Sequence, residues 1–216
     1  MWRALVTTVF CRACPVCGRP AAGEFCWDCQ RQIEATRLSQ PWQFWHGELP
    51  LAAWGRYQDA LKRVLGALKY HGQPELARPL GHYLGDVWLT QGHRLTSEPA
   101  VAPIPLHAQK LKQRGYNQAE LLARHFCRYV GLPLYPDLLL RQTETQAQHW
   151  LSARAREANL ATAFALNPQA RYPRRPLLLL DDIYTTGATA RAVQRTLQQA
   201  GWSVVGILVV ATGRQG

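Results

Sequence analysis

The chain has 216 residues, of which 47% are hydrophobic, enough for one full domain and one small module. Its formal net charge of +11 favours anionic partners such as nucleic acid, nucleotides or pyrophosphate, without distinguishing among them. No apolar run reaches the roughly 18 residues that a membrane-spanning helix needs, so we expect a cytoplasmic protein with no membrane span.

The chain begins with a dense group of cysteines. Two Cys-x-x-Cys pairs, separated by eight residues, have the spacing with which four thiolates bind one tetrahedral zinc ion. The predicted ligands are Cys14, Cys17, Cys26 and Cys29, although Cys11 could take the place of Cys14. Four protein ligands leave no open position, so the zinc would be structural. A redox pair or a disulfide is the alternative to a metal site.

We divide the chain into a zinc-ribbon-like module, residues 1–40, and a main domain, residues 41–216. The boundary falls in a polar stretch that leads into an aromatic cluster. Trp42 and Trp45 are expected to pack between the two parts. Stacking of single-stranded bases on these rings is the alternative.

Two helices are predicted in the first part of the main domain, after a short extended segment. Apolar residues recur at helical spacing from Asp59 until His71-Gly72 interrupts the pattern. The second helix begins at Pro74 and runs to about Thr90, and a polar loop follows it.

A short strand at residues 100–106 runs into a proline-stiffened turn, and the loop after it is basic. Lys110, Lys112 and Arg114 lie in this loop. Basic side chains at this position favour an anionic ligand. A solvated basic face is the alternative for Lys110 and Lys112. His107 is interpreted as a loop histidine, with a phosphate ligand or a base as the alternatives.

The next segments alternate between helix, strand and loop. A helix ends at Gly131, and a short strand follows at residues 138–141. The polar stretch at residues 142–158 is predicted to be a loop, with an amphipathic helical turn at residues 152–160 as the alternative.

The most informative stretch is residues 177–189. Four leucines after Pro176 predict a strand that is buried on both faces. Two acids, Asp181 and Asp182, are expected to follow the strand. A turn of threonines and glycine then leads into a helix, a context that favours phosphate binding. Carboxylates accept hydrogen bonds or hold a cation, so the acids suit sugar hydroxyls and Mg²⁺.

The remaining elements complete an α/β pattern. A helix is predicted at residues 188–200 and another buried strand at residues 204–210. Alternating strands and helices predict a parallel sheet, which binds ligands at the carboxyl ends of its strands.

Residues 177–189 resemble the phosphoribosyl pyrophosphate (PRPP) motif of type I phosphoribosyltransferases at every position of that pattern: four apolar residues, two acids, an apolar and a variable residue, two hydroxyl residues, Gly, a variable residue and a final Thr or Ser. The resemblance implies a catalytic pair, Asp181 and Asp182, that holds the ribose hydroxyls and, through them, Mg²⁺. It also implies a 5′-phosphate loop made of Tyr184, Thr185, Thr186, Gly187, Ala188 and Thr189.

The order of motifs resembles the competence protein F family, also called ComF or GntX-like. The match rests on the cysteine pairs, on Leu68-Lys69-Tyr70-His71-Gly72, on Pro103 through Gln118 and on the PRPP motif, and covers nearly the whole chain. It implies a type I phosphoribosyltransferase-like fold behind a small zinc module. The implied pyrophosphate-binding residues are Pro105, Lys110, Lys112 and Arg114. The stretch at residues 142–158 resembles the hood that covers such sites.

The resemblance implies a PRPP-binding protein of DNA uptake or of the use of external DNA. The expected partners are PRPP or a related nucleotide, single-stranded DNA, and DNA-uptake or helicase machinery. The alternative is an active nucleobase phosphoribosyltransferase of nucleotide salvage. Whether the chain catalyses transfer stays open, because no stretch identifies a pocket for an acceptor base.

Overall fold

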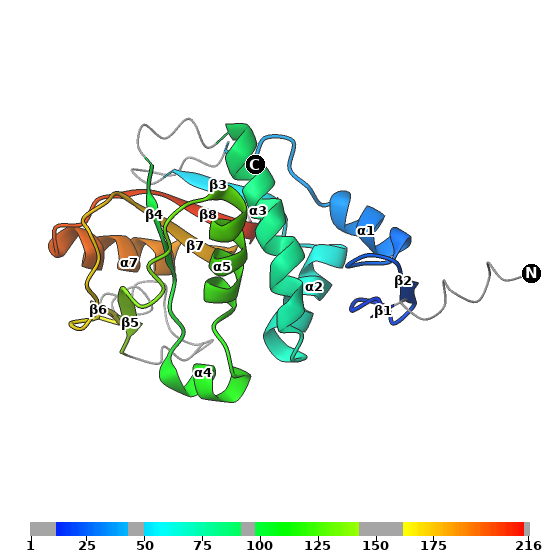
Figure 1. Ribbon diagram of the computed structural model, residues 1–216, viewed down its shortest axis with the longest axis horizontal. Coiled ribbons are helices and arrows are strands. Elements are labelled where there is room, and N and C mark those ends of the chain that lie inside the picture. The colour runs from blue at the N-terminus through cyan, green and yellow to red at the C-terminus, as the bar shows by residue number, and fades with distance from the viewer. Residues whose placement is uncertain (1–11, 43–49, 92–97, 143–161, 214–216) are drawn as a thin grey trace, which may run out of the picture.

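The computed structural model describes residues 12–42, 50–91, 98–142 and 162–213. Four parallel strands form the central sheet in the order β3-β8-β7-β4 (Figure 1). The strands are β3 (Leu51–Arg56), β4 (Ala100–Pro103), β7 (Leu177–Tyr184) and β8 (Val204–Thr212). The predicted α/β class, a parallel sheet with flanking helices, is confirmed.

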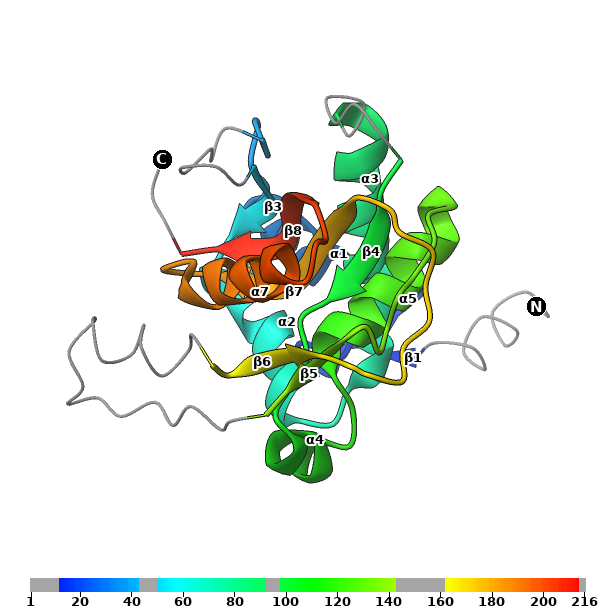
Figure 2. The same cartoon turned by 90° about the vertical axis from the view of Figure 1, so that its left-hand side faces the viewer.

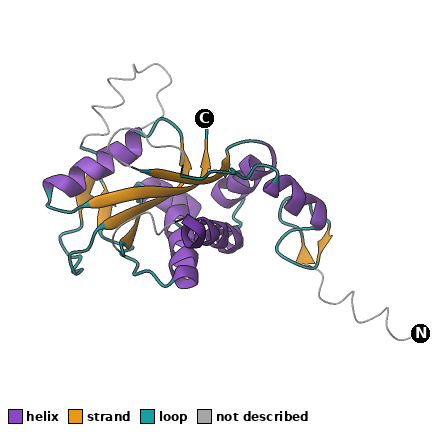
Figure 3. Ribbon diagram, turned by 90° about the horizontal axis from the view of Figure 1, so that it is seen from above, coloured by secondary structure: helices purple, strands orange, loops and turns teal. Residues whose placement is uncertain are grey.

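Helices cover both faces of this sheet, as the view from above shows (Figure 3). One face packs against α2 (Asp59–Tyr70), α3 (Ala77–Gln91) and α5 (Gln118–Val130), and the short helix η1 (Pro74–Leu76) joins the first two. The other face packs against α7 (Ala188–Gln199), and Figure 2 shows α7 on that side of the strands.

The leucine run of β7 explains this double burial. Leu178 and Leu180 lie in the core beneath α2, α3 and α5, whereas Leu177 and Leu179 lie in the core beneath α7. Successive side chains of a strand point to opposite faces, so an unbroken apolar run serves a strand that is covered on both sides.

The cysteine module lies beside α2 (Figure 1). It consists of the antiparallel pair β1 (Arg12–Ala13) and β2 (Pro20–Ala21), followed by α1 (Trp27–Glu34). Its buried residues belong to the same core as α2 and α3. The core is therefore continuous from the module to the sheet. The division between residues 40 and 41 stays a prediction.

Helix α4 (Ala108–Arg114) corrects the prediction of a basic loop. His107 caps this helix, because its Nδ1 accepts a hydrogen bond from the Gln109 amide at 3.4 Å, and Gly115 ends it with a φ of 83°. Helix α5 begins in a similar way, since the Asn117 side chain accepts a hydrogen bond from the Ala119 amide at 3.1 Å. Capping thus sets the boundaries of both helices.

Three further elements differ from the predictions. β7 continues through both acids to Tyr184, so the acids lie within the strand and not after it. α1 extends into a stretch whose polar composition indicated a linker. β5 (Leu139–Arg141) was predicted as a strand, but its antiparallel partner β6 (Phe164–Leu166) was not. Cys11, Trp45 and most of the expected hood, residues 143–158, lie outside the described residues.

Candidate functional site

The two acids of β7 have different surroundings, because consecutive side chains of a strand point to opposite faces. Asp182 is 3% exposed, whereas Asp181 is partly exposed. The Asp181 carboxylate accepts a hydrogen bond from the Asp182 amide at 2.8 Å. The acidic pair therefore has one buried member and one that faces an opening.

Asp182 joins three elements of the structure. Its carboxylate forms an ion pair with the Lys69 ammonium of α2. It also accepts a hydrogen bond from the Gln118 amide group of α5 at 3.2 Å. Gln118 in turn accepts a hydrogen bond from the Arg114 guanidinium at the end of α4. One buried carboxylate thus links the acidic pair to the basic residues of α2 and α4.

The charges of Lys69 and the acids depend on each other. Burial alone would lower the pKa of Lys69, but the attraction of Asp182 outweighs it, so the pKa lies above its ordinary value. Burial, and then the negative charge of Asp182, raise the pKa of Asp181 well above its ordinary value. Lys69 is therefore cationic at neutral pH, and Asp181 accepts a proton more readily than an exposed aspartate.

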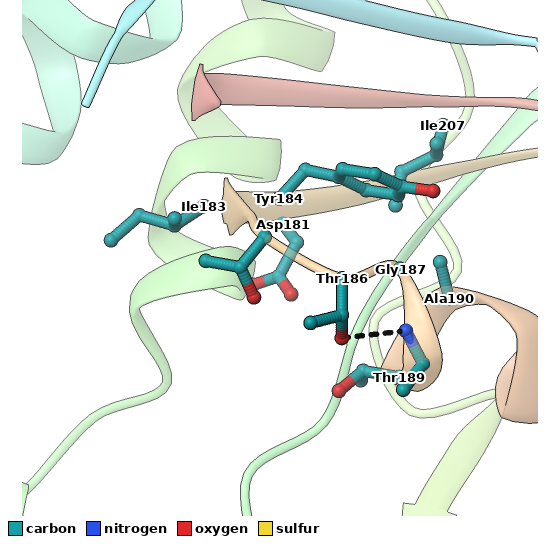
Figure 4. Close-up of a pocket in the computed structure, with 10 residues that line it drawn as sticks. Asp181, Ile183, Tyr184, Thr186, Gly187, Thr189, Ala190 and Ile207 are labelled. Atoms are coloured by element: carbon teal, nitrogen blue, oxygen red, sulfur yellow. Dashed lines mark hydrogen bonds between the residues drawn. The ribbon is translucent and has the colours of Figure 1, made fainter. Parts of the chain in front are cut away.

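Asp181 lines a small pocket of about 40 Å³ together with the loop that follows β7 (Figure 4). A cavity of this volume has room for a small polar group. Its other walls include Tyr184, the threonines of the loop and the start of α7. Figure 4 shows the hydroxyls of Thr186 and Thr189 together at the start of that helix.

Gly187 gives this loop its shape. Its φ of 75° lies in the left-handed region, and a Cβ at this position would overlap the Tyr184 hydroxyl. The loop is fixed further by a hydrogen bond from the Ala188 amide to Thr186 Oγ1 at 3.4 Å. The Arg191 guanidinium donates to the Thr186 carbonyl oxygen at 3.0 Å. A preformed turn therefore leads into the start of α7, and a helix start suits an anion.

A second opening lies beside the basic residues of α4. This cleft of about 380 Å³ is lined by Lys69, Tyr70, Gly72, Lys110, Gln113 and Arg114. Lys69 of this cleft pairs with Asp182, and Asp182 directly follows Asp181 of the small pocket in β7. The two openings therefore lie near consecutive residues of β7, one lined by a carboxylate and the other by cations.

The structure brings most of the predicted site residues together. Asp181 and residues 184–189 line the small pocket, whereas Asp182 is buried and does not, and Lys110 and Arg114 line the cleft. Lys112 is exposed on α4 and does not line the cleft, and neither does Pro105, in the turn after β4. The basic segment thus presents two of its three cations to the site.

The motif patterns missed Lys69, Gln118 and Arg191 as functional residues. Lys69 and Gln118 belong to stretches that carry the family resemblance, so their place in those stretches was a usable signal. The sequence around Lys69 and Gln118 does not indicate that they contact Asp182, because these contacts form only when α2 and α5 pack on the sheet. Arg191 carried no signal beyond its position one turn into α7.

The four predicted cysteine ligands also come together. Their sulfur atoms all lie within 4.8 Å of one another, and those of Cys17 and Cys26 are 3.5 Å apart. Neighbouring sulfurs around a tetrahedral ion with metal–sulfur bonds of about 2.3 Å lie roughly 3.8 Å apart. The donor set and its spacing therefore fit a tetrahedral metal ion.

The turns around the cysteines explain how two of them are held. The Gly18 amide donates to the Cys14 carbonyl oxygen at 2.8 Å, and Gly18 has a φ of 74°. Arg19 donates a hydrogen bond to Cys17 Sγ at 3.4 Å, and this hydrogen bond lowers the pKa of the Cys17 thiol to about 6. Burial raises the pKa of the Cys29 thiol to about 12. A bound cation would favour the thiolate of both.

Among the described residues, no helix has both the length and the apolar character that crossing a membrane requires.

No family model matches the chain. Solved structures with a similar chain path include adenine phosphoribosyltransferase from Leishmania tarentolae, 12% identical, with a TM-score of 0.41 over 85% of this chain and 86% of that one. UMP synthase from Leishmania donovani is 16% identical, with a TM-score of 0.40 over 85% of this chain and 30% of that one.

Curated relatives are more similar in sequence. The DNA utilization protein YhgH of Escherichia coli K12 is 29% identical over 196 residues, 89% of this chain and 80% of that protein. Competence protein ComFC of Bacillus subtilis is 27% identical over 190 residues, 87% and 72% of the two chains. Competence protein F of Haemophilus influenzae is 32% identical over 150 residues, 68% of this chain and 66% of that protein. The chain spans about two thirds of the length of the Haemophilus protein. With these relatives and the predicted order of motifs, the chain belongs to the competence protein F family.

Proposed function

We propose that this protein binds PRPP or a related nucleotide together with Mg²⁺ and acts in DNA uptake or in the use of external DNA. The observation that carries the proposal is the link from Asp182 through Gln118 to Arg114. Asp182 follows Asp181, which lines the small pocket, and Arg114 lines the cationic cleft. PRPP carries a phosphate at one end, ribose hydroxyls in the middle and pyrophosphate at the other.

Each part of the proposed ligand has a matching part of the site. The loop at residues 184–189 and the first amides of α7 would bind the 5′-phosphate. Asp181 would accept hydrogen bonds from the ribose hydroxyls, and Lys110 and Arg114 would face the pyrophosphate. Carboxylate oxygen is the ligand type that Mg²⁺ prefers, so Asp181 suits that ion, which the ribose hydroxyls would also hold. When bound, Mg²⁺ would neutralise part of the pyrophosphate charge.

The DNA role rests on the relatives and on charge. The curated relatives carry the names competence protein and DNA utilization protein. The formal net charge of +11 suits a polyanion, and we take single-stranded DNA as a partner, together with DNA-uptake or helicase machinery. The cysteine cluster would hold a structural zinc ion. A cytoplasmic location belongs to the same proposal, because free thiols persist in a reducing compartment.

Calorimetric titration of PRPP with Mg²⁺ tests the ligand. We expect Asp181→Asn to weaken binding about tenfold or more, because hydrogen bonds to a charged group contribute roughly 1.5–3 kcal/mol. The double variant Asp181→Asn/Asp182→Asn should bind still less. Glu98→Gln is the matched control, since Glu98 is exposed and precedes β4, at the opposite end of the sheet. Equal, negligible binding by the wild type and by Asp181→Asn would remove the ligand assignment.

Two further measurements separate the roles of the bound ligand. Release of pyrophosphate from PRPP in the presence of nucleobases would indicate the alternative function, salvage by phosphoribosyl transfer. Binding of PRPP without release would support a binding protein.

For the DNA role, affinity for single-stranded DNA should fall steeply as salt rises, because phosphate contacts release counterions. An affinity insensitive to salt would contradict that part of the proposal.

A further inference from the structure

Tyr70 is the last residue of α2, and it is 75% exposed although it lines the cationic cleft. A large aromatic side chain that is exposed to water contributes little to stability, and pyrophosphate has no apolar surface for the ring to contact. The cleft thus contains a π surface that the phosphate chemistry described above does not use.

The backbone that carries Tyr70 is fixed on both sides. The preceding residue, Lys69, points inward to its ion pair with Asp182. The Tyr116 hydroxyl donates a hydrogen bond to the Leu68 carbonyl oxygen at 2.5 Å. The end of α2 is therefore held against the sheet and the turn before α5, while the next side chain projects outward. A ring on such an anchored backbone is preorganised for a partner.

Cations surround the ring. The Arg114 guanidinium carbon lies 5.4 Å from the centre of the Tyr70 ring, which is the distance of a cation–π contact. Lys110 lines the same cleft, and none of its six lining residues is acidic. Lys112 lies exposed two residues before Arg114. An exposed ring with guanidinium and ammonium groups beside it matches the chemistry of one nucleotide, a flat base and a phosphate.

We propose that Tyr70 is a stacking platform for an unpaired base of single-stranded DNA. The phosphates next to that base contact Lys112, Lys110 and Arg114, so DNA and the pyrophosphate of PRPP share the last two residues. The inference rests on the DNA role proposed above and assigns a place to it. A paired base is already stacked inside its duplex, so an exposed ring selects single strands. The cleft of about 380 Å³ is within the usual size range of small-ligand sites. The platform lies beside the PRPP end of the site, because Lys69 both lines the cleft and contacts Asp182.

The test compares two fluorescent probes on the full-length protein by anisotropy: a thymidine oligonucleotide of about 20 units, and one of equal length with abasic sites in its central part. The wild type should bind the thymidine probe more tightly, and Tyr70→Leu should weaken that binding about tenfold. Tyr70→Phe should retain the wild-type affinity, since phenylalanine keeps the ring. The preference for bases over abasic sites should shrink in Tyr70→Leu, because both probes carry the same phosphates.

Tyr129→Leu is the matched control, since Tyr129 is also an exposed tyrosine but lies at the far end of α5. It should keep the wild-type preference, and thermal unfolding of each variant establishes that it is folded. If the wild type binds the thymidine probe and folded Tyr70→Leu binds it equally well, the stacking platform is overturned while the DNA role stands. If the wild type binds neither probe, the stacking platform and the DNA role are both overturned. PRPP titration of the wild type bears only on the ligand proposal.

Discussion

The acidic pair shows how two identical side chains acquire different properties. Asp182 is buried, with a cation and an amide group against its carboxylate, so its charge is compensated inside the protein. Asp181 faces the small pocket, where burial and the neighbouring charge raise its pKa. We therefore expect Asp182 to act mainly as a structural anchor and Asp181 to be the carboxylate that contacts a ligand.

Asp181→Asn should stabilise the ligand-free protein near neutral pH. An unfolded aspartate titrates near 3.9, and the pKa of Asp181 in the folded state is higher. The stabilisation from its protonated form is therefore full below about pH 3.9 and is lost as pH rises through the folded pKa. At pH 7–8 we expect the variant to unfold about 2–4 °C higher, the shift that about 1 kcal/mol produces in a chain of this length.

Thermal unfolding between pH 4 and 8 measures this difference, which should shrink toward pH 4. Glu98→Gln, at an exposed carboxylate, should show no such trend. An Asp181→Asn protein no more stable than the wild type at pH 8 would contradict the prediction. A gain in stability with a loss of PRPP binding would show that this carboxylate is retained at a cost to the fold.

At the scale of elements, α2 is the helix that connects the parts of the site. Its end carries Lys69, which contacts β7, and Tyr70, which lines the cleft. Its exposed side carries Arg63, whose guanidinium donates to Gln32 of α1 at 2.9 Å. One helix therefore contacts the cysteine module, the sheet and the cleft.

Lys69→Met should destabilise the protein strongly. The variant leaves the Asp182 carboxylate buried without its cation, which costs roughly 3–5 kcal/mol. Adding Asp182→Asn should recover much of that loss, because the uncompensated charge is removed. Urea unfolding of the wild type, both single variants and the double variant gives the coupling between the two residues.

The exposed pair of Arg124 and Glu120 on α5 is the control for this cycle. Arg124→Met should cost less than about 1 kcal/mol, since ion pairs in water contribute little. Equal losses for Lys69→Met and Arg124→Met would show that burial does not strengthen the first pair, against what we expect.

Elements whose pattern lies within their own residues could be predicted from the sequence. The leucines at residues 177–180 indicated a strand buried on both faces, and the spacing after Asp59 indicated α2. β6 could not be predicted, because three residues carry little periodicity and its partner β5 is distant in the chain. α4 has few apolar residues, and its capping by His107 and Gly115 was not recognised.

The same distinction applies to the candidate site. The loop at residues 185–189 and the acids are adjacent in the chain, so their pattern could be recognised. The contacts of Lys69 and Gln118 with Asp182 join three elements that come together only in the packed fold. Tyr70 is similar: its place in the chain says nothing of its exposure. Residues that are adjacent in the chain thus allow a prediction of the ligand class. The contacts among Lys69, Gln118 and Asp182 depend on how the helices pack on the sheet.

At the scale of the whole molecule, the cysteine module and the sheet share one core. Cys14, Cys29 and Ile33 belong to the same group of buried residues as Trp54 and Leu61. The Gln30 side chain also donates to the Tyr83 hydroxyl of α3 at 3.0 Å. Loss of a metal ion from the cysteines should therefore lower the stability of the main domain as well as that of the module.

Purified protein should contain about one equivalent of zinc, and Cys17→Ser should reduce this below half. Cys17 is exposed, so the substitution removes a ligand with little change in packing. The variant should unfold at a lower temperature in a single transition, because the core is continuous. Metal analysis and scanning calorimetry measure both effects.

Cys127→Ala is the control, since Cys127 is a buried free thiol in α5. Its zinc content should equal that of the wild type. Wild-type protein with intact free thiols and less than half an equivalent of zinc would count against the metal site. A separate early transition in Cys17→Ser, with the main one unchanged, would count against coupling of the two parts.

The double burial of β7 has a consequence for how this protein can vary. A single inserted or deleted residue among Leu177–Leu180 would exchange the leucines between the two cores and turn Asp182 away from Lys69 and Gln118. Exchanging one leucine for another aliphatic residue alters only volume and shape. Related chains should therefore differ here in the kind of aliphatic residue and keep the strand the same length.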